Sequence, residues 1–186
     1  MQSVQQKKSR RYLLLVVAAF ALPIIVAKLA LELNWLDYGV TNQGQLIENE
    51  ANLTDLGLGK LDFNQHWLIL YVLPEQCHAD CEKTLETVHN TYVALGREVP
   101  RVTPVALIQS ELTTLQKQSV ASSKWRIEMM PTDTKQFFKE PKIVIVDPLG
   151  NLVLTHSIPG DSAQLPAFGK MIVADMKKLL KYSRIG

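Results

Sequence analysis

The chain has 186 residues, with 20 Lys and Arg against 18 Asp and Glu, and it contains only two cysteines. This length suits one domain of ordinary size with an appendage. The charge is nearly balanced, and no long basic run interleaved with aromatic residues follows the N-terminus, which argues against nucleic acid as a partner.

The N-terminal residues predict a membrane anchor. A basic tail, residues 1–11, precedes residues 12–27, which carry no charge. Because the hydrocarbon core of a bilayer requires about 20 apolar residues, we expect a transmembrane helix over residues 12–33, with membrane lipid as its partner. A cleaved signal peptide is the alternative, but the apolar stretch is longer than such peptides use and no Ala-x-Ala site follows it.

The positive charge before this helix predicts its orientation, since basic flanks stay in the cytoplasm. The rest of the chain is then exported. In a bacterium this predicts a single-pass protein of the inner membrane with a cytoplasmic N-terminus and a periplasmic globular domain, where cysteines can oxidise.

The remaining chain predicts a linker and one domain. Residues 34–60 are rich in Gly and Asn and predict a linker with the irregular start of the domain, including a turn and a short strand at 42–47. Apolar, β-favouring patterns predict strands over residues 66–73, 101–108, 125–130, 142–147 and 152–156. Helical spacing of apolar residues predicts helices over 77–95, 110–120 and 164–182, with a helical turn at 132–138. This order predicts an α/β, thioredoxin-like domain over residues 61–186, preceded by one N-terminal transmembrane helix.

Three residues are expected to mark boundaries within this domain. Gly96 ends the first helix of the domain. Pro104 favours an edge or entry position in its strand, because proline cannot donate to the strand ladder. Ser110 is a suitable cap for the helix that follows it.

The two cysteines lie four residues apart, where the first long strand gives way to a helix. Cys77 stands at the helix start, where unpaired N–H groups and the helix dipole favour a thiolate, and Cys81 lies one turn on, on the same face. The pair can exchange thiols, form a disulfide, or bind a soft metal such as Cu(I), with His78 or another histidine as a third ligand. Glu75 and Asp80 oppose thiolate formation. A purely structural bridge is the alternative, although so short a loop adds little stability.

The strand over residues 67–73, the Cys77-x-x-x-Cys81 motif and the following helix resemble the Sco/SenC group of thioredoxin-like, membrane-anchored copper proteins. The resemblance covers the chain from about Leu46 onward. It implies a role in cytochrome c oxidase assembly, with oxidase subunits or other assembly factors as partners. It also implies copper as a cofactor, bound by Cys77, Cys81 and a distant histidine.

The family's histidine does not carry over cleanly. Counted back from the Val146-Asp147-Pro148-Leu149-Gly150 motif, its position falls at about Lys139, and residues 132–142 contain no histidine. His156, beyond the hairpin turn, is the candidate taken here for the third copper ligand, and only folding decides whether it reaches the cysteines.

Residues 140–150 also resemble thioredoxin-like reductases of the periplasm, in which a cis-proline precedes the same strand and packs beside the active cysteines. Pro141 holds that position. The sequence does not give its isomer, and a trans proline that starts a strand is the alternative to the cis form.

Together, these resemblances predict a thiol-disulfide oxidoreductase or copper-handling protein of oxidase maturation. Cys77 is expected to attack and Cys81 to resolve the mixed disulfide. The alternative of a different class is a non-catalytic, degenerate thioredoxin-like scaffold that docks on an oxidase or another membrane complex, with its cysteines merely bridged.

Overall fold

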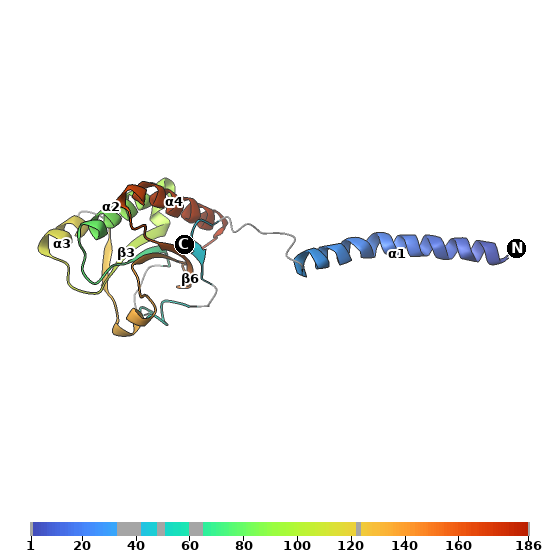
Figure 1. Cartoon of the computed structure of the whole chain (residues 1–186), viewed down its shortest axis with the longest axis horizontal. Helices are drawn as coiled ribbons and strands as arrows, with labels where there is room; N and C mark the ends of the chain where they lie inside the picture. The colour runs from blue at the N-terminus through green and yellow to red at the C-terminus, as the bar shows by residue number, and fades with distance from the viewer. Residues whose placement is uncertain (1, 33–41, 48–50, 60–64, 122–123, 186) are drawn as a thin grey trace. The chain divides into compact units, whose positions relative to one another are not determined.

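The computed structural model of the chain describes residues 2–32, 42–47, 51–59, 65–121 and 124–185 (Figure 1). Residue 33 of the predicted membrane helix lies outside the described residues, as do residues 34–41, 48–50 and 60–64 of the predicted linker and domain start. The chain divides into two compact units, residues 1–41 and 42–186. Each unit is considered by itself.

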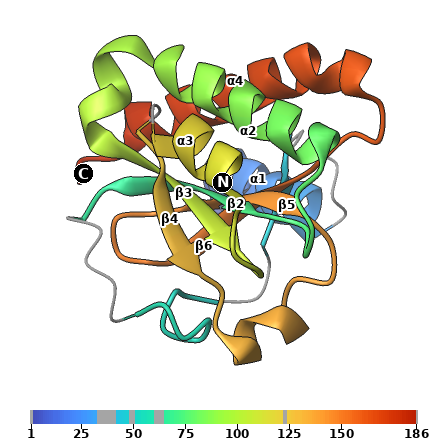
Figure 2. The same ribbon diagram turned by 90° about the vertical axis from the view of Figure 1, so that its left-hand side faces the viewer.

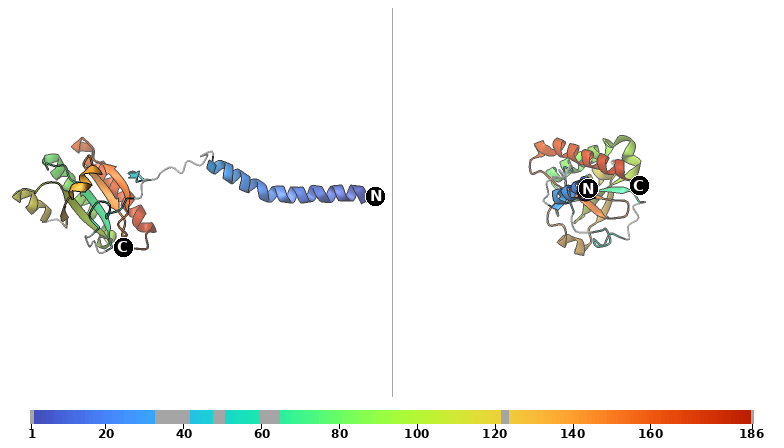
Figure 3. Two further views of the ribbon diagram at one scale, coloured as in Figure 1. Left: turned by 90° about the horizontal axis from the view of Figure 1, so that it is seen from below. Right: turned by 90° about the vertical axis from the view of Figure 1, so that its right-hand side faces the viewer.

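The first unit contains one long helix, α1 (Gln2–Glu32), with Pro23 inside it. Figure 3 shows α1 as a continuous, gently bent helix. Its stretch Arg10–Ala30 has a mean hydropathy of 2.6 and is not buried against other parts of the chain. This stretch is long and apolar enough to cross a membrane, and proline is tolerated within such helices.

The second unit is built on one sheet. Within the described residues, the sheet has six strands in the order β1-β6-β5-β2-β3-β4. The strands are β1 (Gln45–Leu46), β2 (Trp67–Val72), β3 (Val102–Ile108), β4 (Arg126–Met129), β5 (Lys142–Val146) and β6 (Leu152–Ser157). The strands β2, β3 and β4 are parallel, and β5 is antiparallel to both of its neighbours, β2 and β6.

Helices cover one face of this sheet. They are α2 (Ala79–Val93), α3 (Thr114–Ala121) and α4 (Leu165–Tyr182). The domain also has short 3-10 turns, η1 (Gly96–Arg101), η2 (Thr132–Gln136) and η3 (Ser162–Gln164), of which η2 lies on the opposite face. Figure 2 shows α2 and α4 side by side along the sheet. The arrangement confirms the predicted α/β, thioredoxin-like fold and the predicted positions of the strands.

The central strand β2 explains why its sequence is apolar without interruption. All six of its residues are buried. Alternate side chains, Ile69 and Tyr71 among them, pack on the face covered by α2 and α4. The others, such as Leu68 and Leu70, pack against residues 51–58 and the surroundings of η2 on the opposite face. A strand covered on both faces has no solvent side that would require polar residues.

Two helix starts differ from the predictions. Helix α2 begins at Ala79, so Cys77 lies in the preceding loop and His78 is the N-cap. Helix α3 begins at Thr114, and the predicted cap, Ser110, instead donates a hydrogen bond to the backbone carbonyl of Glu75. Ser110 therefore serves a tertiary contact, and the prediction that it caps a helix is wrong.

Pro104 lies in the interior strand β3, at a position where β3 is paired with a neighbouring strand on one side only. It pairs with Ile69 of β2, whereas β4 pairs with β3 only from Val105 onward. The missing N–H of proline therefore costs no bond to β4. Gly96 has a φ of 61° and follows the end of α2, as predicted for a residue that stops a helix.

Candidate functional site

The two cysteines form a disulfide at the N-terminus of α2. Their Cα atoms are 5.2 Å apart, a distance that suits such a bond. Cys77 lies in the loop and is partly buried, whereas Cys81 lies in the first turn of α2 and is only 6% exposed. The bridge thus joins a more accessible residue to an enclosed one, at the helix end where N–H groups lack intrahelical partners.

The loop that carries Cys77 is held by the segment after β3. Three side chains of that segment donate hydrogen bonds to alternate carbonyls of the loop: Gln109 to Leu73 (2.9 Å), Ser110 to Glu75 (2.5 Å) and Gln116 to Cys77 (2.7 Å). Loop carbonyls have no sheet or helix partner, so these bonds satisfy groups that secondary structure leaves open. The loop is therefore positioned by polar contacts from a single neighbouring segment.

Gln116 connects three elements through one side chain. Its Oε1 accepts a hydrogen bond from the backbone N–H of Thr113 (3.0 Å), and its own N–H donates to the Thr113 hydroxyl (3.3 Å). This reciprocal pair is a capping box at the start of α3. The Gln116 Nε2 donates both to the Cys77 carbonyl and to the carboxylate of Glu82 on α2 (3.1 Å). The sequence analysis missed this residue, although Thr-x-x-Gln is the signal of such a box.

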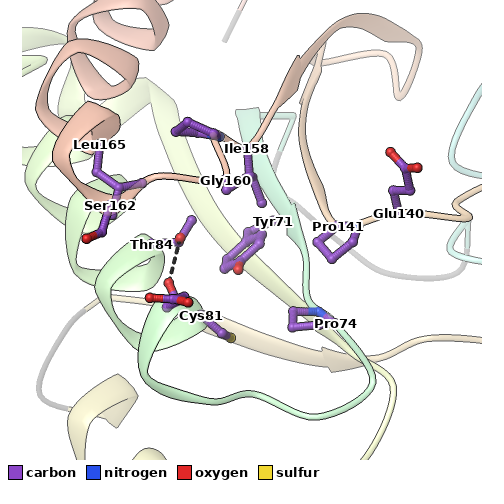
Figure 4. A pocket seen from close by; sticks show the side chains of 12 residues that line it. Tyr71, Pro74, Cys81, Thr84, Glu140, Pro141, Ile158, Gly160, Ser162 and Leu165 are labelled. Atoms are coloured by element: carbon purple, nitrogen blue, oxygen red, sulfur yellow. Dashed lines mark hydrogen bonds between the residues drawn. The ribbon is translucent and has the colours of Figure 1, made fainter.

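A pocket of about 300 Å³ opens beside Cys81 (Figure 4). Its lining comes from the end of β2, the first turns of α2, the approach to β5 and the segment after β6. The principal residues are Tyr71, Pro74, Cys81, Thr84, Pro141, Ile158, Gly160 and Leu165. A partner group that reached Cys81 from this side would contact mainly apolar surface, and the carboxylates of Asp80 and Glu140 also line the pocket.

Pro141, singled out by the resemblance to periplasmic reductases, lines the same pocket as Cys81. Its peptide bond is trans, which matches the alternative of a trans proline that starts a strand. Pro141 immediately precedes β5. A proline before the first ladder residue needs no N–H, and the trans bond is the lower-energy form.

Tyr71 places a neutral hydroxyl at this pocket. Its side chain is 1% exposed, and burial raises the pKa of Tyr71 to about 12, opposed by a hydrogen bond with Thr84. The Thr84 hydroxyl in turn donates to the carbonyl of Asp80 (2.8 Å). Tyr71 therefore stays protonated at any physiological pH.

His156 lies in a different cluster. It is 2% exposed, and its Nε2 is 3.3 Å from a carboxylate oxygen of Asp175 on α4, with the Phe168 ring edge-on to it. Asp175 accepts hydrogen bonds from the backbone N–H groups of Gln43 and Gly44 at 2.8–3.0 Å. Burial lowers the pKa of His156, and the charge of Asp175 opposes this effect. The cluster ties the first residues of the domain to α4.

The predicted copper set of Cys77, Cys81 and His156 is not assembled. Across the part of the chain that the structure describes, no three His, Cys, Asp or Glu side chains are grouped so that they could hold a metal ion. The cysteines are bonded to each other, and His156 is enclosed with Asp175 and Phe168. Only after reduction of the disulfide would two sulfurs be free as ligands.

Fold and site together define a thioredoxin-like protein with a disulfide between strand and helix. A protein family described as "Transmembrane-like, thioredoxin-like, C-terminal domain" has a model that matches residues 67–183. The chain belongs to this family. No curated protein matches the chain.

Three solved structures of similar fold are examples of what the domain resembles. The thioredoxin domain of a thiol-disulfide oxidoreductase from Bacteroides vulgatus is 16% identical, with a TM-score of 0.47 over 73% of this chain and 90% of that one. Copper-bound ScoI from Arabidopsis thaliana is 13% identical, with a TM-score of 0.43 over 61% and 86%. BsSco, a member of the Sco family of cytochrome c oxidase assembly proteins, is 11% identical, with a TM-score of 0.46 over 77% and 96%. At such low identity no activity is transferred from them.

Proposed function

We propose that this protein is a membrane-anchored thiol-disulfide exchange protein whose Cys77–Cys81 pair cycles between disulfide and dithiol. The observation that carries the proposal is the disulfide at the start of α2, with Cys77 partly accessible and Cys81 lining an open pocket. A bridge across four residues constrains the unfolded chain by about 2 kcal/mol, less than a bridge that closes a longer loop, so stability alone is a weak reason for it.

The exchange begins when a thiolate of a partner dithiol attacks the Sγ of Cys77. A mixed disulfide forms, the Cys77–Cys81 bond breaks, and its electron pair leaves on Cys81, which takes up a proton. The partner's second thiolate then attacks the partner's sulfur in the mixed disulfide and releases the Cys77 sulfur, which takes up the second proton. Two electrons and two protons pass from the partner dithiol to this protein. Run in reverse, the dithiol form reduces a partner disulfide.

The chain's own groups tune this chemistry in opposite directions. The open N–H groups of the first turn of α2 stabilise a thiolate on Cys77. Asp80 and Glu82 in the same turn are acidic and oppose it. Gln116 donates to the Cys77 carbonyl and to Glu82, and so holds the Cys77 backbone beside the end of the helix.

The membrane helix and the resemblance to the Sco group also suggest where the protein acts and with which partners. The helix α1 would hold the domain at a bacterial inner membrane, with the N-terminus in the cytoplasm and the domain in the periplasm. Cytochrome c oxidase subunits or their assembly factors are the proposed partners, and the reduced pair is proposed to carry Cu(I) on its two thiolates.

The exchange activity is tested on the full chain in lipid nanodiscs. After equilibration in glutathione redox buffers, a maleimide reagent should label two thiols together, in one two-electron transition. With a partner disulfide, Cys81→Ser should accumulate a mixed disulfide through Cys77, and Cys77→Ser should not. A disulfide that strong reductant cannot open in the native protein would contradict the proposal. The scaffold would then be favoured if a Cys77→Ser, Cys81→Ser variant also supported full oxidase assembly.

The copper extension is tested separately, by anaerobic Cu(I) titration of the reduced protein against a competing chelator. Binding should disappear in the double serine variant and persist in His156→Gln, because His156 belongs to the other cluster. Binding that survives the loss of both sulfurs would rule out Cys77 and Cys81 as ligands.

A further inference from the structure

A second hollow adjoins the pocket beside Cys81. It is a groove of about 760 Å³ lined by residues of α2 and α4, the two helices that lie side by side in Figure 2. Ser162 and Leu165 line both the pocket and the groove. Both helices begin near the pocket, so the groove leads away from the disulfide along the helix pair.

The groove exists because the helices meet at small residues. A Cβ atom on Gly169 of α4 would lie only 2.9 Å from the Thr91 Oγ1 and 3.3 Å from the Thr87 Cγ2 of α2. Only glycine allows this close approach. The neighbouring lining residues Val173 and Ala174 also have short side chains, so the groove between the helices is shallow and its floor is apolar.

The rim of the groove is mainly basic. Lys83, Lys170 and Lys177 line it, against the single carboxylate of Glu86. All three lysines are exposed, and among the described residues none of them pairs with a carboxylate at salt-bridge distance. An apolar floor between unpaired cations is complementary to a segment that carries apolar and acidic residues together.

We propose that the groove between α2 and α4 docks the redox partner of the Cys77–Cys81 pair. This inference rests on the proposed exchange function and names the substrate class: a cysteine-bearing polypeptide segment whose reacting sulfur meets Cys77, next to the pocket lined by Cys81. The residues beside that sulfur are apolar and acidic, and they lie along the groove between Lys83, Lys170 and Lys177. Charge complementarity of this kind acts mainly on the rate of association.

The test compares peptides that differ only in charge. Each carries an intramolecular disulfide at one end and a leucine-rich tail with three Glu, three Gln or three Lys residues. The reduced full-length protein in neutral-lipid nanodiscs should reduce the Glu peptide about tenfold faster than the Gln peptide at low ionic strength, and the Lys peptide slowest. The difference should shrink at high salt, because screening removes it.

Two charge reversals locate the effect. The double variant Lys170→Glu, Lys177→Glu should lose the preference for the Glu peptide. The control Lys135→Glu should keep it, because η2 packs against Leu56 on the opposite face of the sheet. Equal rates for all three peptides would overturn the proposal, as would a double variant that still prefers Glu or a control that loses the preference equally.

A neutral small disulfide, hydroxyethyl disulfide, separates the two proposals. It should be reduced at the same rate by the wild-type protein and by the Lys170→Glu, Lys177→Glu variant. If it is reduced while the peptides show no charge preference, the docking surface fails and the exchange function stands. If it is not reduced at all, the exchange function itself fails.

Discussion

Two regions on the helical side of the sheet hold backbone segments with distant side chains, in different ways. The cysteine loop is held by neutral donors, Gln109, Ser110 and Gln116, that bond to its carbonyls. The first residues of the domain are held by the buried carboxylate of Asp175, which binds two backbone N–H groups and lies beside His156.

The two kinds of contact differ in strength and in how much of the held segment stays accessible. Neutral hydrogen bonds at a partly exposed loop each contribute about 1 kcal/mol, so the loop is positioned while Cys77 remains accessible. A buried carboxylate with several donors contributes more to stability, because its loss leaves buried groups without partners. The predicted copper site had joined residues from both regions, which the structure shows as two separate groups, the Cys77–Cys81 disulfide and the His156–Asp175 pair.

The largest effect is expected when the buried carboxylate of Asp175 is removed. Asp175→Ala should lower the free energy of unfolding of residues 42–186 by about 3 kcal/mol, because two backbone N–H groups and His156 lose a charged partner. Urea unfolding measures it. The control Asp161→Ala removes an exposed cap to Ala163 and should cost about 1 kcal/mol. Equal losses in the two variants would show that the buried Asp175 contacts stabilise the domain no more than an exposed cap does.

Reducing the disulfide should have a smaller effect. Opening a loop of this length should lower the free energy of unfolding by about 2 kcal/mol, and the reduced domain should stay folded because the strand core does not depend on the bridge. Urea curves and near-ultraviolet circular dichroism, with and without reductant, measure both quantities. A reduced protein that unfolds would indicate that the bridge is a structural staple.

The third effect concerns Gln116. In Gln116→Glu the capping box with Thr113 remains, since glutamate also accepts that bond, but the donors to Cys77 and Glu82 are lost and a negative charge is added. Alkylation of Cys77 in the reduced protein should slow about fivefold at pH 7, as a partly exposed charge contact of about 1 kcal/mol implies.

Two measurements separate this positioning role from a structural one. The urea midpoint of Gln116→Glu should fall only by the amount expected for lost neutral hydrogen bonds, about 1 kcal/mol each, and Gln109→Ala should show a loss of the same kind. Gln109→Ala, which removes the bond to Leu73 only, should leave the alkylation rate at the wild-type value. An unchanged rate in Gln116→Glu would show that the contact with Cys77 does not influence the sulfur.

The smallest effect is a pH dependence of stability. Burial lowers the pKa of His156 below its ordinary 6.5, so in mildly acidic solution the unfolded chain binds a proton that the folded chain does not. Stability should therefore fall as pH decreases through about 6.5 towards the lowered pKa. Urea midpoints at pH 7.5 and 5.5 should differ for the wild type and differ less for His156→Gln. Identical slopes would exclude His156 as the source.

Local patterns in the sequence predicted most of the fold. The uninterrupted apolar runs at 66–73 and 142–147 could only be buried strands, and both were found within a residue or so of the predicted bounds. The start of α3 was missed because Ser110 and Thr113 are both good caps. The choice between them depends on the Glu75 carbonyl, which lies 35 residues away from Ser110.

The site was predicted less completely. The position of the cysteines at a strand-to-helix junction follows from neighbouring residues, as does that of Pro141 just before β5. The partner of His156 does not, because Asp175 reaches it only when α4 packs across the sheet. The isomer of Pro141 likewise depends on the folded surroundings and not on the local sequence.

By itself, the sequence determined the apolar N-terminal helix, the order of strands and helices, and the pair Cys77 and Cys81 at the start of a helix. These features depend on residues within one or two turns of each other. Only the tertiary structure decided that His156 belongs with Asp175, that Gln116 holds Cys77 from 39 residues away, and that a basic groove adjoins the pocket beside the disulfide. Each of these depends on packing between separate elements, which no local pattern encodes.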